Sequence, residues 1–255
     1  MTGREADSCS APYRVRFDEA GPDGRLRTSV LLRYAQDLAW FHSAARGFDR
    51  AWYAEHGLTW LVRTAAIEVD AAALVGSELV GTTRVVGARR VWARRRTDFV
   101  DAAGELVALV NIDWVLLDGR GAPTRIPADF DHVFGMAHEP IELGRVDLRD
   151  EAQDAVRSSF RVRPQELDPM DHVNNAVYAD WLDEAVIASG GLESVRSIPR
   201  VARLEYARAA ESGSTVETAT WPEPDGSWAC RITDAGGADL LRARLSASGA
   251  SPGTS

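Results

Sequence analysis

Four side chains suited to acyl chemistry lie close together in the second half of the chain: Asp168, His172, Asn174 and Asn175. Asp168 precedes Pro169, which favours an extended backbone, and the asparagines stand where a helix is expected to begin. The first N–H groups of a helix carry partial positive charge and can stabilise a carbonyl oxygen that gains negative charge. A nearby carboxylate can act as general base toward water or as nucleophile. The imidazole can orient or polarise the substrate.

A structural role fits the same residues. Asp168, Asn174 and Asn175 are good helix caps, and His172 would then be a satisfied polar residue. Because a carboxylate four positions before a histidine is a common spacing, this spacing alone favours the structural interpretation.

The elements that must position these residues occur in two similar copies, because the sequence contains an internal repeat. Arg14-Val15-Arg16 recurs 147 positions later as Arg161-Val162-Arg163. An amphipathic helix is predicted after each copy, over 28–45 and 175–189, with Thr28 or Ser29 capping the first. Strand-like runs follow each helix, separated by turn-forming residues. The predicted strands are Trp60–Val69, Glu78–Val86, Arg89–Val100, Leu106–Leu117, Val201–Tyr206, Thr215–Trp221, Trp228–Thr233 and Leu240–Ser246.

The repeat provides an internal comparison for the candidate site. Gly21 stands in the first half where Asp168 stands in the second, and Arg25 stands where His172 does. A structural need of the fold for the acid–imidazole pair would be expected in both halves.

The order of elements predicts an α+β fold in which a long helix lies on a curved antiparallel sheet. We expect an N-terminal unit at 12–128, a linker at 129–158 and a C-terminal unit at 159–248. Residues 1–11 and 248–255 are expected to be disordered tails. Cys9 falls in the first tail, and Cys230 is expected to be a small buried hydrophobe.

The segment from Asp168 to Trp181 follows the pattern D-x-x-x-H-V-N-N-x-x-Y-x-x-W. It resembles the active-site motif of the acyl-acyl carrier protein thioesterase family. The resemblance extends over about residues 13–246. Further matches are the segments Phe17–Gly24, Trp60–Arg63, Arg95-Arg96, Trp114, Arg125–Pro127 and Leu204–Tyr206.

This resemblance implies two tandem hot-dog units, each a long helix wrapped by a curved antiparallel sheet. It implies hydrolysis of a fatty acyl-acyl carrier protein, with acyl-coenzyme A as a second possible thioester, and no cofactor. The family's catalytic Asp and His match Asp168 and His172. The N-terminal unit would bind the acyl chain, and the C-terminal unit would carry the chemistry.

Three positions depart from the pattern of the plant members. Met170 replaces an Asn, and Ala209-Ala210 replace Glu-Cys. Glu211 could substitute for that Glu only if the strand end shifts. The departures leave Asp168, His172 and the helix N–H groups as the site.

Other residues are candidates for substrate binding. Tyr178 and Trp181 lie one turn apart on the predicted helix and are expected to pack in the core, a position compatible with lining an acyl tunnel. Arg95 and Arg96 belong to a basic run that either docks the acidic carrier protein or forms a solvated strand face. The run comprises Arg89, Arg90, Arg94, Arg95 and Arg96.

Composition excludes several classes of function. The formal net charge of −9 disfavours nucleic-acid binding. The spacing of His42, His56, His132 and His138 fits no metal site, and structural roles are expected for them.

No apolar run is long enough to span a membrane and no secretory leader is present, so a cytoplasmic location is expected. The pseudo-dimeric chain is expected to be a monomer or to form a homodimer.

Two alternatives to a thioesterase stay open. A non-catalytic protein that binds an acyl carrier or an acyl lipid on the same fold would explain Met170, Ala209 and Ala210. A hot-dog dehydratase or hydratase fits the sequence around His172 less well.

Overall fold

The computed structural model describes residues 7–135 and 145–247 of the 255-residue chain, with only the backbone at Asp131. His138 lies outside the described residues. The chain divides into two compact units. The first comprises Met1–Ala65 and Ala72–Gly144, and the second comprises Ala66–Ala71 and Arg145–Ser255.

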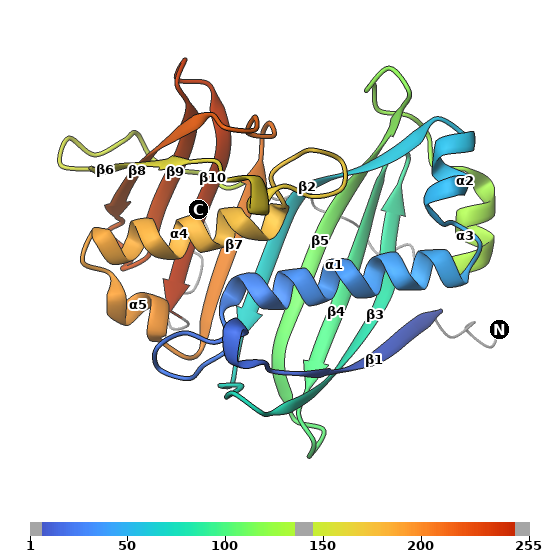
Figure 1. Ribbon diagram of the computed structural model, residues 1–255, viewed down its shortest axis with the longest axis horizontal. Coiled ribbons are helices and arrows are strands. Elements are labelled where there is room, and N and C mark those ends of the chain that lie inside the picture. The colour runs from blue at the N-terminus through green and yellow to red at the C-terminus, as the bar shows by residue number, and fades with distance from the viewer. Residues whose placement is uncertain (1–6, 136–144, 248–255) are drawn as a thin grey trace. The chain divides into compact units, whose positions relative to one another are not determined.

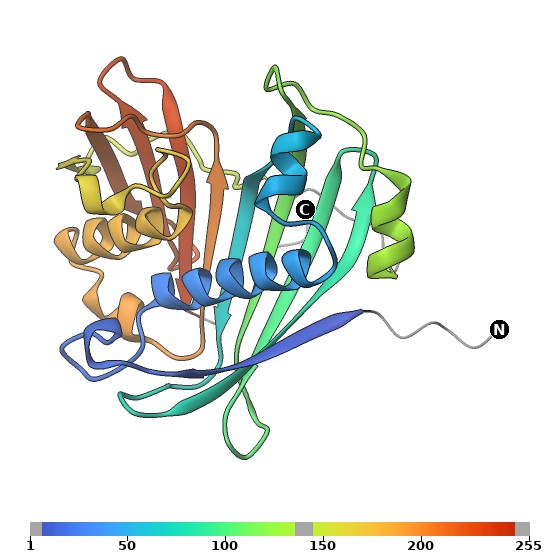
Figure 2. The ribbon, with the colours of Figure 1, turned by 45° about the vertical axis from the view of Figure 1, so that its right-hand side comes forward.

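In the first unit, the long helix α1 lies on an antiparallel sheet (Figures 1 and 2), as the sequence predicted. The strand order in this unit is β1-β3-β4-β5-β2. Its elements are β1 (Ser8–Arg14), η1 (Phe17–Glu19), α1 (Thr28–Ala45), α2 (Arg50–Glu55), β2 (Leu58–Val69), β3 (Glu78–Arg89), β4 (Trp92–Val100), β5 (Leu106–Asp118) and α3 (Ala128–Phe134). From Ala66 on, β2 is assigned to the second unit.

Helix α1 forms because most of its apolar residues recur at helical spacing and are buried on one face; Trp40 and Phe41 are exposed. Leu31, Leu38 and Ala35 are almost completely buried. The ring of Tyr34 lies 6.3 Å from that of Phe99 on β4. The helix is therefore fixed mainly by burial of one face.

The second unit repeats this arrangement with α4 on the sheet β7-β10-β9-β8-β6 (Figure 1). Its elements are β6 (Val156–Arg161), η2 (Pro164–Glu166), α4 (Asn175–Ala188), α5 (Leu192–Arg196), β7 (Arg200–Tyr206), β8 (Thr215–Pro222), β9 (Trp228–Asp234) and β10 (Asp239–Ala247). Cys230 is buried on β9, as expected, and burial raises the pKa of its thiol to about 11.

The repeat found in the sequence is reproduced in the hydrogen bonds. Val15 follows the first strand of its unit and its N–H donates to the carbonyl of Ser77 at 2.9 Å. The N–H of Val162 donates to the carbonyl of Ser214 at the same distance. Both valines are buried, so each anchors the chain between a strand and the turn that leads to the long helix.

The short helices η1 and η2 are also capped by equivalent hydrogen bonds. A carboxylate oxygen of Glu19 accepts the N–H of Arg16 at 2.9 Å, and one of Glu166 accepts the N–H of Arg163 at 2.7 Å. In the first unit Glu19 is buried and also accepts the hydroxyl of Tyr34. The two units therefore present equivalent turns before their long helices.

The prediction of a disordered tail is wrong for residues 8–11. They belong to β1, which pairs with β3 from Ser8 opposite Arg84 to Arg14 opposite Glu78. The strand includes Cys9. It was missed because an edge strand with alternate residues exposed has weak hydrophobic periodicity.

Smaller corrections concern element ends. Arg27, and neither Thr28 nor Ser29, is the N-cap of α1, without a side-chain cap. Arg89 ends β3 and does not begin β4. Arg90 occupies the turn between them with φ of 54°.

Among the described residues, no helix is long and apolar enough to cross a membrane.

Candidate active site

A tight turn presents Asp168 just before α4. Leu167 and Val173 form an antiparallel bridge at its base. The N–H of Asp168 donates to the carbonyl of His172 at 2.7 Å, and the N–H of Asp171 donates to the carbonyl of Asp168 at 3.0 Å. Asp171 takes a φ of 61°, a left-handed conformation that Asp tolerates better than most residues.

The carboxylate of Asp168 is held by the backbone of its own turn. Its Oδ1 accepts the N–H of Met170 at 2.8 Å and the N–H of His172 at 3.3 Å. The residue is half-buried, and its other carboxylate oxygen has no hydrogen bond within the described residues. One oxygen is thus fixed and the other is left for an external partner.

The imidazole of His172 is not joined to this carboxylate. His172 is exposed, and over residues 7–135 and 145–247 its ring makes no hydrogen bond. The contact between the two residues runs through the backbone N–H of His172. Sequence proximity therefore places the acid and the imidazole in one turn without pairing their side chains.

The equivalent turn of the first unit forms without an acid at the position of Asp168. The N–H of Gly21 donates to the carbonyl of Arg25 at 2.9 Å, and the N–H of Gly24 donates to the carbonyl of Gly21 at 2.9 Å. Gly24, with φ of 74°, takes the conformation that Asp171 adopts in the second unit. Oδ1 of Asp23 accepts the N–H of Arg25 at 3.1 Å in the first turn, as Oδ1 of Asp168 accepts the N–H of His172 in the second. The turn therefore does not require its acid at the position of Asp168.

The amino end of α4 follows directly. Asn174 is the N-cap, and its side chain accepts the N–H of Ala176 at 2.9 Å. Asn175 is the first residue of the helix, and its carbonyl accepts the hydroxyl of Tyr206 at 3.0 Å. The capping role predicted for an asparagine here is confirmed for Asn174. Tyr206, on β7, ties the helix start to the sheet.

Tyr178 and Trp181 pack in the core, as predicted. Both are at most 3% exposed, and their rings lie 5.0 Å apart. The Tyr178 ring also contacts Tyr206 at 5.5 Å, and the Trp181 ring stacks on Phe160 at 6.0 Å. Burial raises the pKa of Tyr178 to about 12, so it stays protonated at neutral pH.

The loop after β7 meets α4 where the sequence departs from the plant pattern. The N–H of Ala210 donates to the hydroxyl of Tyr178 at 2.9 Å, and Ala210 is buried. Ala209 is exposed. Glu211 is exposed too, in a turn where its carbonyl accepts the N–H and hydroxyl of Ser214.

The basic run does not form one surface patch. Arg95 is only 7% exposed, so it cannot be a docking residue. Alternation along β4 instead points it toward α1 and turns its neighbours outward. There Arg94 pairs with Asp113 at 2.6 Å and Arg96 pairs with Asp98 at 2.7 Å.

Sequence reasoning missed Asp183, a half-buried carboxyl group on α4. Burial raises its pKa to about 7, Arg200 opposes this shift, and Asp180 adds to it. Asp183 was overlooked because it lies at the border of the apolar face, where a carboxylate usually reaches water.

His42 and His56 have structural positions, as expected. His56 is the C-cap of α2. His42 is buried at the end of α1 and bonds Asp7 and Arg95. Within the described residues, no group of three His, Cys, Asp or Glu side chains could hold a metal ion.

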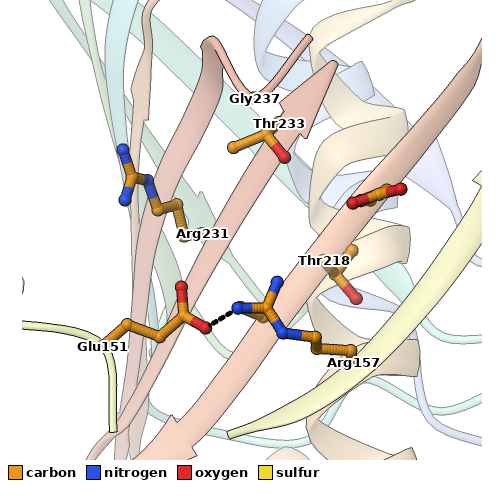
Figure 3. A pocket seen from close by; sticks show the side chains of 8 residues that line it. Glu151, Arg157, Thr218, Arg231, Thr233 and Gly237 are labelled. Carbon is orange, nitrogen blue, oxygen red and sulfur yellow. Dashed lines mark hydrogen bonds and ion pairs between the residues drawn. The ribbon is translucent and has the colours of Figure 1, made fainter. Parts of the chain in front are cut away.

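A hollow of about 190 Å³ lies elsewhere on the second unit (Figure 3). Arg157, Glu217 and Ala219 of its lining are on the face of the sheet opposite α4, because they alternate with Phe160, which stacks on Trp181, and its partner Val216. Glu151 and Arg157 form an ion pair across it. The hollow does not include the Asp168 turn. Its lining is Glu151, Arg157, Glu217, Thr218, Ala219, Arg231, Thr233 and Gly237.

Comparison with known proteins adds to this geometry. Residues 7–132 match the acyl-ACP thioesterase N-terminal domain, and residues 149–244 match the C-terminal domain. A chloroplastic acyl-acyl carrier protein hydrolase of Cuphea viscosissima is 23% identical over 235 residues, covering 84% of this chain and 55% of the relative. The chain thus spans about half the length of the curated relatives it matches.

Solved structures share the fold. A protein described as an oleoyl thioesterase of Lactobacillus plantarum superposes with a TM-score of 0.85 and 20% identity, covering 96% of this chain and 97% of its own. A 12:0-ACP thioesterase of Umbellularia californica gives 0.78 and 22%, covering 94% and 96%. The fold is that of two tandem hot-dog units. With both halves matched by the family's domains, the chain belongs to the acyl-ACP thioesterase family.

Proposed function

We propose that this protein hydrolyses a fatty acyl-acyl carrier protein to the free acid, with acyl-coenzyme A as a second thioester of the same chemistry. Family membership supports the reaction class. The observation that carries the assignment of the site is a difference between the two equivalent turns, since Asp168 in the second turn stands where the first has Gly21.

In this mechanism the unbonded oxygen of Asp168 works as general base or as nucleophile. As base it takes a proton from water, whose oxygen attacks the thioester carbonyl. As nucleophile it forms an acyl anhydride that water then hydrolyses. In either route the carbon–sulfur bond breaks and the thiolate leaves. His172, exposed in the same turn, orients the thioester or protonates the thiolate.

The amino end of α4 stabilises the oxyanion through its aligned peptide dipoles. Asn174 acts as a positioning residue, because its side chain holds the N–H of Ala176. Asn175 begins the helix, and the hydroxyl of Tyr206 fixes its carbonyl. This arrangement provides an oriented helix end close to Asp168.

We assign the acyl chain to an N-terminal unit at 12–128 and the chemistry to a C-terminal unit at 159–248, joined by a linker at 129–158. Tyr178 and Trp181 support the catalytic helix from the core side. Carrier docking falls to the exposed members of the basic run, Arg89 and Arg90.

We further propose a cytoplasmic protein that is a monomer or a homodimer and inserts into no membrane. Cell fractionation and the mass in solution test these points. A membrane-bound fraction or a larger assembly would contradict them.

Thiol release from a panel of acyl-acyl carrier proteins and acyl-coenzyme A thioesters, with the product acids identified, tests the reaction. We expect release with at least one chain length. No release across the panel would contradict a thioesterase.

A second candidate is a non-catalytic protein that binds an acyl carrier or acyl lipid. Two observations favour it: the ring of His172 makes no hydrogen bond within the described residues, and Ala209 and Ala210 offer no acid or thiol. It predicts binding of the acyl-carrier protein without release of thiol.

A further inference from the structure

Arg95 is a cation buried inside the first unit. It lies on the face of β4 that also carries Thr97 and Phe99, both buried under α1. Burial lowers the pKa of Arg95 to about 10, so it keeps its charge at neutral pH. A buried charge normally has a counter-ion, because leaving water without one is costly.

No carboxylate contacts Arg95 among the described residues. Its Nη1 donates to Nδ1 of His42 at 2.9 Å, and its Nη2 donates to Oγ of Ser43 at 3.4 Å. Its guanidinium lies over the ring of Phe134, 5.6 Å from the centroid. A guanidinium has five N–H donors, so these neutral partners leave it short of acceptors.

Asp7, an acid whose charge acts on Arg95, contacts His42 and not Arg95, and it is shared with Arg46. Asp7 accepts from Nε2 of His42 at 2.9 Å and pairs with Arg46 at 2.5 Å. Because Nε2 donates to Asp7 and Nδ1 accepts from Arg95, the ring of His42 is neutral. Burial and the charge of Arg95 lower the pKa of His42, which keeps the ring neutral. His42 therefore supplies an acceptor to Arg95 but no negative charge.

Trp114 provides a second, independent donor on the same face. Ala93 pairs with Trp114 and Arg95 pairs with Ile112, so Arg95 and Trp114 are diagonal neighbours on β4 and β5. Long side chains at such positions reach one another. The Nε1 of Trp114 is buried and finds no acceptor in the part of the chain that is described. Orphaned buried donors of this kind are rare and call for an explanation.

The surroundings of these donors are aromatic. Phe134, next to Arg95, belongs to a cluster with Phe48 and Phe130. Trp60 packs against this cluster and donates its Nε1 to the hydroxyl of Tyr53 at 2.9 Å. Both Trp60 and Tyr53 are only half-buried. An apolar lining with a few directed polar groups is typical of a site for an amphipathic small molecule.

We propose that the first unit binds a long-chain carboxylate whose head group is held by the guanidinium of Arg95 and the Nε1 of Trp114. The carboxylate supplies both the missing charge and the missing acceptor, and its aliphatic chain lies against the aromatic cluster. This goes beyond hydrolysis, because it assigns a site for the free acid in the unit that lacks the Asp168 turn.

Titration of the full chain tests the proposal, with dodecanoate kept below its micelle concentration and dodecanol below its solubility limit. Calorimetry should show dodecanoate binding at least about tenfold tighter than dodecanol, the effect of one charge-assisted hydrogen bond. In a ¹⁵N–¹H spectrum, the indole signal missing from Trp114→Phe should shift with dodecanoate and not with dodecanol.

The variants separate this site from a purely structural Arg95. Arg95→Met should abolish the preference for dodecanoate, whereas Arg96→Met, on the outer face of the same strand, should keep it. If Arg95→Met does not fold, Trp114→Phe alone must weaken dodecanoate binding about tenfold. Equal affinities for the two probes in the unmodified protein, no binding of dodecanoate, or an unchanged preference in Arg95→Met or Trp114→Phe would overturn the proposal. None of these readouts needs thioesterase activity.

Discussion

Asp183 should make the protein less stable as the pH rises from about 4 to about 7. Its pKa in the folded chain is about 7, against 3.8 for a free aspartate. In acid, the Asp183 carboxyl group is protonated in both the folded and unfolded states, so no charge is buried on folding. As pH rises the unfolded chain ionises first, so the free energy of unfolding falls until the folded carboxyl ionises above pH 7.

The size of this effect follows from the shift. About three pKa units at roughly 1.4 kcal/mol each amount to about 4 kcal/mol. Roughly half falls between pH 5.5 and 8.5, a range above the sequence pI of 5.1. We halve it again because the half-buried side chain keeps some contact with water. The expected loss is about 1 kcal/mol, or ~2–4 °C in Tm for a chain of this size.

Urea unfolding at pH 5.5, 7 and 8.5 measures it. Asp183→Asn should remove this component of the pH dependence, and Glu184→Gln, an exposed position on the same helix, should not. If Asp183→Asn follows the pH dependence of the unmodified protein, the carboxyl group is not desolvated and the reasoning is refuted.

Three further variants test individual contacts by urea unfolding. Asp171→Gly should stabilise the protein by about 1 kcal/mol by relieving a φ of 61°; a loss of stability would show that no strain exists there. Tyr178→Phe should cost about 1–3 kcal/mol, because it leaves the buried N–H of Ala210 without an acceptor; an unchanged midpoint would contradict this contact. Gly191→Ala should cost about 1–3 kcal/mol, since its Cβ would meet Val186 at 2.5 Å, and Gly236→Ala is the milder control. Equal effects of the two alanines would argue against that packing.

The main elements could be predicted because their hydrophobic periodicity agrees with the capping and turn residues at their ends. The predicted first helix matches α1 at both ends, and Asn174 caps α4 where the sequence places a cap. Each predicted strand corresponds to an observed one, with ends shifted by a few residues. The repeat could be found because the same turn must precede both long helices.

Features set by tertiary contacts were not predictable. The strand at Ser8 is stabilised by its pairing with β3, which a local window does not contain. Arg95 looks like its neighbours in a basic run, and only its register on β4 shows that it is the member turned inward. The same holds for the candidate site: spacing brings Asp168 and His172 together, but side-chain orientation separates the carboxylate from the ring.

The most direct test of the account is thiol release by Asp168→Asn beside the unmodified protein, on the acyl-acyl carrier protein that the latter cleaves fastest. The Asn side-chain oxygen can still accept the N–H groups of Met170 and His172, so the turn and the Tm should be preserved. We predict a fall in kcat/KM of at least about 100-fold from loss of the base or nucleophile. Full activity in a folded Asp168→Asn protein would contradict the central claim.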